Sequence, residues 1–280
     1  MTNNHSGVNN FPLRIIHPIH EHSSDEHKAF MHAIALAHAA SGEIEIIDVR
    51  QSEDAHMSFS VRAVLEKWGI LPADSNRSDV GKLGMKVTKI IKKGEAKRIV
   101  THRLEKHDHD MLVIGTHERH GLGVLFGLDL AEYLAISFRQ TTLYVPAKAR
   151  PFVNPDTGEV TLKKILIPVA AEPPSDLSFS FLQMLLSVFK KESAPEVIGL
   201  HCGESFPDLP PYLMSGISFR EVLSAESVTS AIIETARSND VDLIVMTTQG
   251  RTTLPKKIMG SVTEQVLHAS PCPVLSIPVE

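Results

Sequence analysis

The sequence predicts an α/β protein that contains two doubly wound, five-stranded parallel sheets, each with the strand order 3-2-1-4-5. Three observations support this prediction. Short apolar runs alternate with longer segments of helical character, the same series of segments occurs twice, and turn-forming residues separate the segments in both copies. Short strands without polar alternation are typical of strands buried on both faces, and helices between them imply parallel neighbours joined by right-handed crossovers.

Strands of the first copy are expected at LRIIHPI, EIEIIDV, GMKVTKII, DMLVIG and TTLYVP. The helices between them are expected at SSDEHKAFMHAIALAHAASG, SFSVRAVLEKWGI, EAKRIVTHRLEKH and around residues 122–138. Ser24 or Asp25 would cap the first of these helices, and Gly42 would be its C-cap.

The second copy repeats this series. Its strands are expected at KILIPVA, PEVIGLHC, ISFREVLS, LIVMT and CPVLSIP. Its helices are expected at FSFLQMLLSVFKK, at residues 226–238 and from about 257 to 268, and PDLPPYLMSG reads as an irregular stretch.

Two offsets relate the copies. RIIHPI is similar to KILIPV, so that Pro18 matches Pro168 at an offset of 150. DMLVIG is similar to DLIVMT, so that Asp110 matches Asp242 at an offset of 132. The second copy is therefore 18 residues shorter between its first and fourth strands. The repeat is far longer than the 20–50 residues of a solenoid unit, which indicates two copies of one domain.

The predicted domains are residues 1–148 and 163–280, with a linker at 149–162. The segment PAKARPFVNPDTGEVTLK around this linker holds three prolines and a turn-forming DTG, as a linker or hairpin does. The length of 280 residues fits two domains of ordinary size.

Composition narrows the classes of function. The chain is 42% hydrophobic and 22% charged, with a formal net charge of −5. A mildly acidic chain is a poor general binder of nucleic acid, and no apolar run approaches the length needed to cross a membrane. The first residues lack the pattern of a signal peptide, and two cysteines give no disulfide pattern, so we expect a cytoplasmic protein.

Glycines mark a candidate anion site in the second copy. Doubly wound sheets bind ligands where the strand order reverses, beyond the carboxyl ends of the first and fourth strands. Gly250 follows the fourth strand, and Gly260-Ser261 opens the next helix nine residues later. Glycine permits close approach of a phosphate, and a helix N-terminus favours an anion, although a glycine after a strand is usually only a turn.

These segments resemble the universal stress protein family, whose nucleotide signature is G-x2-G-x9-G-[S/T]. The resemblance is carried by ILIPV, DLIVMTTQGR, IMGSVTEQVL and HASPCPVLSIP, and the chain is identified as a tandem member. It implies a Rossmann-like, adenine nucleotide alpha hydrolase-like fold. Many members bind ATP, few have known enzymatic activity, and some act through protein partners under stress.

The resemblance assigns a nucleotide site to the second copy, with ATP or another anionic nucleotide as ligand. Gly250, Gly260 and Ser261 match the signature, whereas Thr247 stands at its first glycine and Ala170 replaces the usual aspartate after the first strand. The candidate binding residues are Val169, Ala170, Thr247, Gly250, Arg251, Gly260, Ser261 and Val262.

The first copy departs further from the signature. Glu118 replaces its second glycine, His20 stands at the aspartate position, and Asp129 lies near its last pair. Carboxylates there would repel phosphate, so we expect no ATP binding by the family mode in this copy.

Thirteen of the 15 histidines precede residue 121. Among them, His17 and His20 follow or end the first strand, and His117 and His120 follow the fourth, so these four could meet in one cleft and bind zinc. The alternatives are polar cleft and surface histidines, a core position for His17, and pH sensing.

The sequence thus favours a non-enzymatic stress-response or regulatory protein with no catalytic residues. The alternative is a zinc-binding protein or metal-assisted hydrolase that uses the histidine-rich cleft. Expected partners are a nucleotide and an unidentified protein, without nucleic acid or membrane. The two copies would form an intramolecular pseudo-dimer, with TLYVP and PVLSIP as pairing strands, and a homodimer of whole chains is a further alternative.

Overall fold

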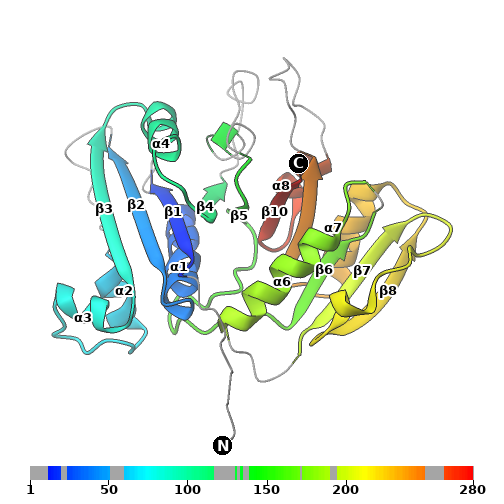
Figure 1. The fold of residues 1–280 in the computed structure, drawn as a ribbon, viewed down its shortest axis with the longest axis horizontal. Helices are drawn as coiled ribbons and strands as arrows, with labels where there is room; N and C mark the ends of the chain where they lie inside the picture. Colours follow the sequence, from blue (N-terminus) through cyan, green and yellow to red (C-terminus); the bar gives the residue numbers. More distant parts are fainter. Residues whose placement is uncertain are drawn as a thin grey trace, which may run out of the picture.

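A single ten-stranded sheet organises the fold (Figure 1). The computed structural model describes residues 12–19, 24–50, 60–116, 130, 133–134, 139–170, 172–189, 194–249 and 262–279. The strands are β1 (Arg14–Ile19), β2 (Glu43–Arg50), β3 (Lys86–Lys93), β4 (Met111–Thr116), β5 (Thr142–Pro146), β6 (Lys164–Pro168), β7 (Glu196–Cys202), β8 (Ser218–Ser224), β9 (Leu243–Gln249) and β10 (Val274–Val279). The helices are α1 (Ser24–Ala39), α2 (Val61–Lys67), α3 (Arg77–Lys82), α4 (Ala96–Leu104), α6 (Asp176–Phe189), α7 (Val228–Ser238) and α8 (Val262–Ala269), with a 3₁₀ turn, η2, at Pro211–Met214.

The strand order confirms the predicted topology of each half. The sheet runs β3-β2-β1-β4-β5-β10-β9-β6-β7-β8, so each half has the order 3-2-1-4-5. Strands within a half are parallel, whereas β5 and β10 pair antiparallel, with Tyr144 opposite Val274. The two predicted five-stranded sheets therefore join along their fifth strands into one continuous sheet.

One aspartate in each half braces the first strand to the fourth. Asp110 Oδ2 accepts a hydrogen bond from the Arg14 backbone N–H at 2.8 Å, and the Arg14 guanidinium binds the same carboxylate. Asp242 Oδ2 accepts from the backbone N–H groups of Lys163 and Lys164 at 2.8 and 3.0 Å. Arg14 and Lys164 are 150 residues apart, and the aspartates are 132 apart, so the bonds reproduce both sequence offsets.

Two local features differ from the sequence predictions. The residues after α1 form a Schellman motif in which Ser41 has a φ of +47° and Gly42 N–H bonds to Ala37 O. Gly42 is required for another reason, because a Cβ there would lie 2.4 Å from the Leu13 carbonyl oxygen. In addition, the short helix α3 was not expected, and the predicted helix at 122–138 falls largely outside the described residues.

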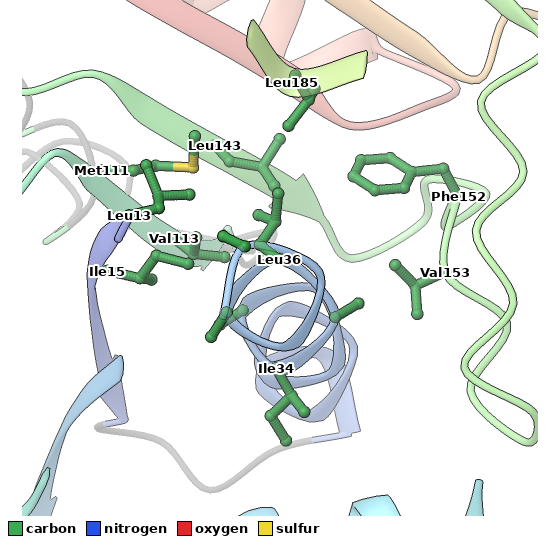
Figure 2. Packing of buried hydrophobic residues seen from close by; sticks show 14 of the residues in the cluster. Leu13, Ile15, Ile34, Leu36, Met111, Val113, Leu143, Phe152, Val153 and Leu185 are labelled. Carbon is green, nitrogen blue, oxygen red and sulfur yellow. The ribbon is translucent and has the colours of Figure 1, made fainter. Parts of the chain in front are cut away.

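Helices cover both faces of the sheet and bury two cores. One core lies under α1, α2 and α6 and continues across the β5–β10 junction, because α1 and α6 contact each other on this face. Figure 2 shows Leu36 of α1 and Leu185 of α6 with Leu143 of β5 in this core. The other core lies under α4, α7 and α8.

The predicted linker contains a turn whose apolar residues are part of the first core. Phe152 is only 1% exposed, and its ring meets the His32 ring of α1 edge-on at a centroid distance of 4.4 Å. Val153 and Val160 form a β-bridge across the turn. Gly158 has a φ of +72° and faces the Trp68 ring, where a Cβ would lie 2.5 Å from Cδ2. We call residues 150–162 the joint hairpin.

The same hairpin is bonded to the second half. The Arg150 backbone N–H donates to Pro271 O at 2.8 Å. The Arg150 guanidinium donates to Asp240 O at 2.6 Å and also contacts the Asp242 carboxylate at 3.3 Å. The joint hairpin therefore holds contacts to both halves. No helix among the described residues is long and apolar enough to cross a membrane.

Replacing Phe152 with alanine is expected to lower the free energy of unfolding by about 3–5 kcal/mol, because it removes a fully buried ring and leaves a cavity beside His32. Urea denaturation followed by circular dichroism measures the change. The control is Tyr212→Ala, since Tyr212 is 66% exposed and its loss should change stability by less than about 0.5 kcal/mol. Equal stability of the two variants would contradict a structural role for the hairpin.

Candidate functional site

The candidate nucleotide site of the second half lies where β6 and β9 end. β6 lies between β7 and β9, so the strand order reverses at the β6–β9 pair. The last paired residues of these two strands are Leu166 and Ile244. Val169 and Thr247 each follow three positions later, so they reach the carboxyl edge together. The loops that leave this edge are the ones that bind ligands in doubly wound sheets.

Val169 is fixed by bonds to the neighbouring strand. Its backbone N–H donates to Leu200 O at 2.7 Å, and its carbonyl oxygen lies 2.8 Å from His201 Nδ1. Because a carbonyl can only accept, Nδ1 carries the proton of the His201 ring. The next residue, Ala170, is exposed and brings no carboxylate to the edge. His201 was not among the candidate site residues, although its place near the end of the second copy's second strand was an available signal.

Aromatic rings line the β7 side of this edge. The Phe206 ring packs edge-on to His201 at 6.2 Å and to Phe219 of β8 at 6.0 Å. Gly199 of β7 makes room for them, because a Cβ there would lie 2.4 Å from the Phe219 ring. The edge is therefore apolar beside His201.

The β9 side carries neutral hydroxyl groups. Thr247 is buried, and its Oγ1 lies 3.5 Å from the Pro173 carbonyl oxygen. The Thr248 hydroxyl lies 3.3 Å from the Ser276 hydroxyl of β10. Val262 begins α8 and is partly exposed.

The other four candidate binding residues lie outside the described part of the chain, namely Gly250, Arg251, Gly260 and Ser261. Their assignment therefore stays a prediction. The structure brings the described candidates of β6 and β9 to one edge, where none of Val169, Ala170, Thr247 and Thr248 carries a charge.

Among the four candidate zinc ligands, the structure describes only His17. Its ring is fully buried on β1, with Nδ1 2.8 Å from Val113 O and the Phe30 ring 5.6 Å away. His17 thus occupies the core, which was one of the alternatives. His20, His117 and His120 lie outside the described residues, and within the described ranges no three His, Cys, Asp or Glu side chains are grouped to hold a metal.

Several other histidines serve as packing residues. His32 is fully buried, and its Nδ1 lies 2.7 Å from Lys28 O in the preceding turn of α1. Burial lowers the pKa of His32 to about 4, so the ring is neutral at pH 7. Burial also lowers the pKa values of His38 and His109.

The cysteines have the properties of packing residues. Cys272 is buried in the second core, and burial raises the pKa of its thiol to about 12. Burial also raises the pKa of Cys202. A thiol that stays protonated is a poor nucleophile.

A polar cleft of about 390 Å³ lies at the opposite, amino edge of the first half. Ion pairs line it, among them Lys86 with Glu43 at 2.8 Å and Arg103 with Glu45. The side chain of His109 is 5% exposed there, with its Nε2 3.9 Å from Glu45 Oε1. Because Glu43 and Glu45 both have cationic partners, we regard this cleft as a structural ion-pair cluster.

Comparison with known proteins assigns the chain to a family. The model of the universal stress protein family matches residues 13–146 and 212–278. A universal stress protein of Methanothermobacter thermautotrophicus is 40% identical over 58 residues, which is 21% of this chain and 39% of that protein. The match therefore spans about two fifths of the relative's length.

Solved structures of similar fold cover nearly the whole chain. A universal stress protein from Archaeoglobus fulgidus has a TM-score of 0.66 and 15% identity, covering 95% of this chain and 96% of the other. A functionally unknown protein from Pseudomonas aeruginosa PAO1 has a TM-score of 0.60 and 15% identity, with 95% and 92% covered. At this identity the likeness shows the fold alone.

Fold and site together define a doubly wound α/β protein whose candidate ligand edge lies at the carboxyl ends of its strands. The family match extends over most of the residues and includes both halves. The chain belongs to the universal stress protein family.

Acid is expected to destabilise the protein through His32. Its pKa is about 4 when folded and 6.5 as a free side chain, so its stabilising effect is complete above pH 6.5 and is lost as the pH falls toward 4. The loss amounts to about 3 kcal/mol across that window.

Urea denaturation at several pH values measures this slope. The matched control is His32→Leu, which keeps an apolar side chain against Phe152 but cannot titrate. We expect a shallower fall in stability for this variant between pH 6.5 and 4. Parallel slopes for the two proteins would show that His32 does not titrate in this way.

Proposed function

We propose that this protein is a non-catalytic stress-response regulator that binds ATP, or another anionic nucleotide, at the carboxyl edge of β6 and β9. The observation that carries the proposal is that the described candidate residues at this edge are uncharged. Val169, Ala170 and Thr247 lie at a strand-order reversal and carry no carboxylate, so these three residues would not repel phosphate groups.

The described contacts suggest which part of the nucleotide each side would receive. The loop with Gly250 and the Gly260-Ser261 pair would bind phosphates through backbone N–H groups and the N-terminus of α8. The fixed carbonyl of Val169 and the rings of His201 and Phe206 would then face the nucleoside. Aromatic and apolar walls with few polar groups suit such a ligand.

A regulatory rather than catalytic role fits the side chains at this edge. Within the described part of the site, none of Val169, Ala170, Thr247 and Thr248 has an acidic or basic side chain. General acid–base chemistry needs a group placed within hydrogen-bond reach of the reacting proton, and the threonine hydroxyls supply none of suitable pKa. Ligand binding would therefore act as a signal to a protein partner in the cytosol.

Pairing of β5 with β10 supports a second part of the proposal. The two halves would act as an intramolecular pair, in which only the second binds nucleotide by the family mode. In the first half, Glu118 and Asp129 would oppose phosphate binding. One chain would then carry one nucleotide.

Restoring a carboxylate at Ala170 is expected to strengthen ATP binding. Ala170→Asp would offer the nucleoside hydroxyl groups a charged acceptor, for a gain in affinity of about tenfold. Isothermal titration calorimetry with ATP measures the change. Ala73→Asp is the matched control, since it adds the same charge at an exposed position in the loop between α2 and α3 and should leave binding unchanged.

Blocking the anion loop is expected to weaken ATP binding. Gly260→Val places a branched side chain where the phosphate would approach, and the dissociation constant should rise at least tenfold. Absence of ATP binding in both the unchanged chain and Ala170→Asp would refute the nucleotide proposal. Steady release of phosphate from ATP, lost in Gly260→Val, would refute the non-catalytic part alone.

A further inference from the structure

Positive charge is concentrated in one short segment of this acidic chain. Residues 77–106 contain ten lysines and arginines but only three aspartates and glutamates, a formal net charge of +7. The whole chain carries −5, so the other 250 residues carry −12. Such asymmetry within one chain indicates a surface for an anionic partner.

The structure places this segment at one end of the sheet. It comprises α3, β3 and α4, and β3 is the last strand in the order (Figure 1). In the described part of the chain, β3 pairs with β2 on one side and with no strand on the other. An edge strand leaves backbone N–H and C=O groups open to another chain.

Part of the charge is used within the protein. Lys82 pairs with Asp79, Lys86 with Glu43, Lys89 with Asp48 and Arg103 with Glu45. The Lys97 ammonium lies 3.6 Å from the centre of the Tyr133 ring. The remaining exposed cations have no ion-pair partner among the described residues, and we call them the basic edge: Arg77, Lys92, Lys93, Arg98 and Lys106.

The opposite edge of the same sheet provides an internal comparison. Lysine on an edge strand commonly prevents unwanted strand pairing. β8 is also an edge strand that must avoid unwanted pairing. Its single cation, Arg220, bonds to Glu196 and Asn239, both at 2.8 Å. Leu223 on β8 and Ile91 on β3 are also similarly exposed, at 50% and 53%. Edge protection alone therefore does not explain the unpaired cations beside β3.

We propose that the basic edge binds an extended acidic segment of a partner protein, which adds to the sheet as a strand beside β3. The open backbone groups of β3 would bond the segment's main chain. Because side chains alternate across a strand, Lys92 lies on one face of β3, and Ile91 and Lys93 lie on the other. Lys92 would pair with carboxylates on one face of the added strand, and the exposed Ile91 would contact apolar side chains on its other face.

A strand-forming acidic peptide fits this surface better than a nucleic acid does. A nucleic acid would use the cations but not the free backbone edge. A nucleic acid that extends beyond the basic edge would also meet repulsion from the rest of the chain, whose formal net charge is −12. An acidic peptide uses both features over a shorter length.

The test measures binding of two blocked eight-residue peptides to the full-length protein by fluorescence anisotropy. One peptide alternates glutamate with valine, and the other alternates glutamate with proline. Both carry equal charge, but proline lacks the N–H group that strand pairing needs. We expect the valine peptide to bind in low salt, with affinity falling as salt rises, and the proline peptide to bind at least about fivefold more weakly.

The variant Lys92→Glu should weaken binding of the valine peptide at least about fivefold, because it replaces an attraction with a repulsion. Lys163→Glu is the matched control, since Lys163 is exposed and lies outside the basic edge. Thermal unfolding of both variants checks that they fold.

Three outcomes would overturn the proposal. Equal binding of the two peptides would show that the basic edge binds them through charge alone, without strand addition. A short DNA duplex that binds as tightly as the valine peptide would assign the basic edge to nucleic acid. If the folded protein binds neither peptide in low salt, the basic edge is not a binding surface for acidic peptides.

Discussion

Antiparallel pairing of β5 with β10 is the contact on which the rest of the architecture depends. Each half is a five-stranded sheet whose fifth strand would otherwise be an open edge, and the pairing satisfies both edges at once. It also brings α1 and α6 together on one face, so that a single apolar core extends across the junction. Only the outermost strands, β3 and β8, are left as edges of the described sheet.

Much of this fold could be predicted from the sequence, because its signals are local and occur twice. Apolar runs located the strands, and two offsets predicted that Asp110 and Asp242 are equivalent, which their matching bonds to β1 and β6 confirm. Features set by long-range contacts could not be predicted. Gly42 matches a C-cap pattern, but its close approach to Leu13 becomes visible only once β1 lies beside it.

The candidate site could also be predicted only in part. Strand order placed Val169 and Thr247 at one edge, whereas the bond between Val169 and His201 depends on the register of β6 and β7 and had no local sequence signal. For the histidines, the sequence suggested more than the structure supports. Their number suggested a metal cleft, but the role of an imidazole depends on its burial. His17 and His32 are core residues on β1 and α1. His20, His117 and His120 remain a prediction because they lie outside the described residues.

The joint hairpin has a consequence for the history of the molecule. A connector between two copies usually stays free to change, but here Phe152 fills the core of one copy and Arg150 is bonded to the other. Separating the copies would leave a hole in the first and remove the hydrogen bonds that Arg150 donates to the second. Such a fusion is difficult to reverse in evolution. Both copies now depend on the peptide that joins them, so separate domains would need compensating substitutions in each copy.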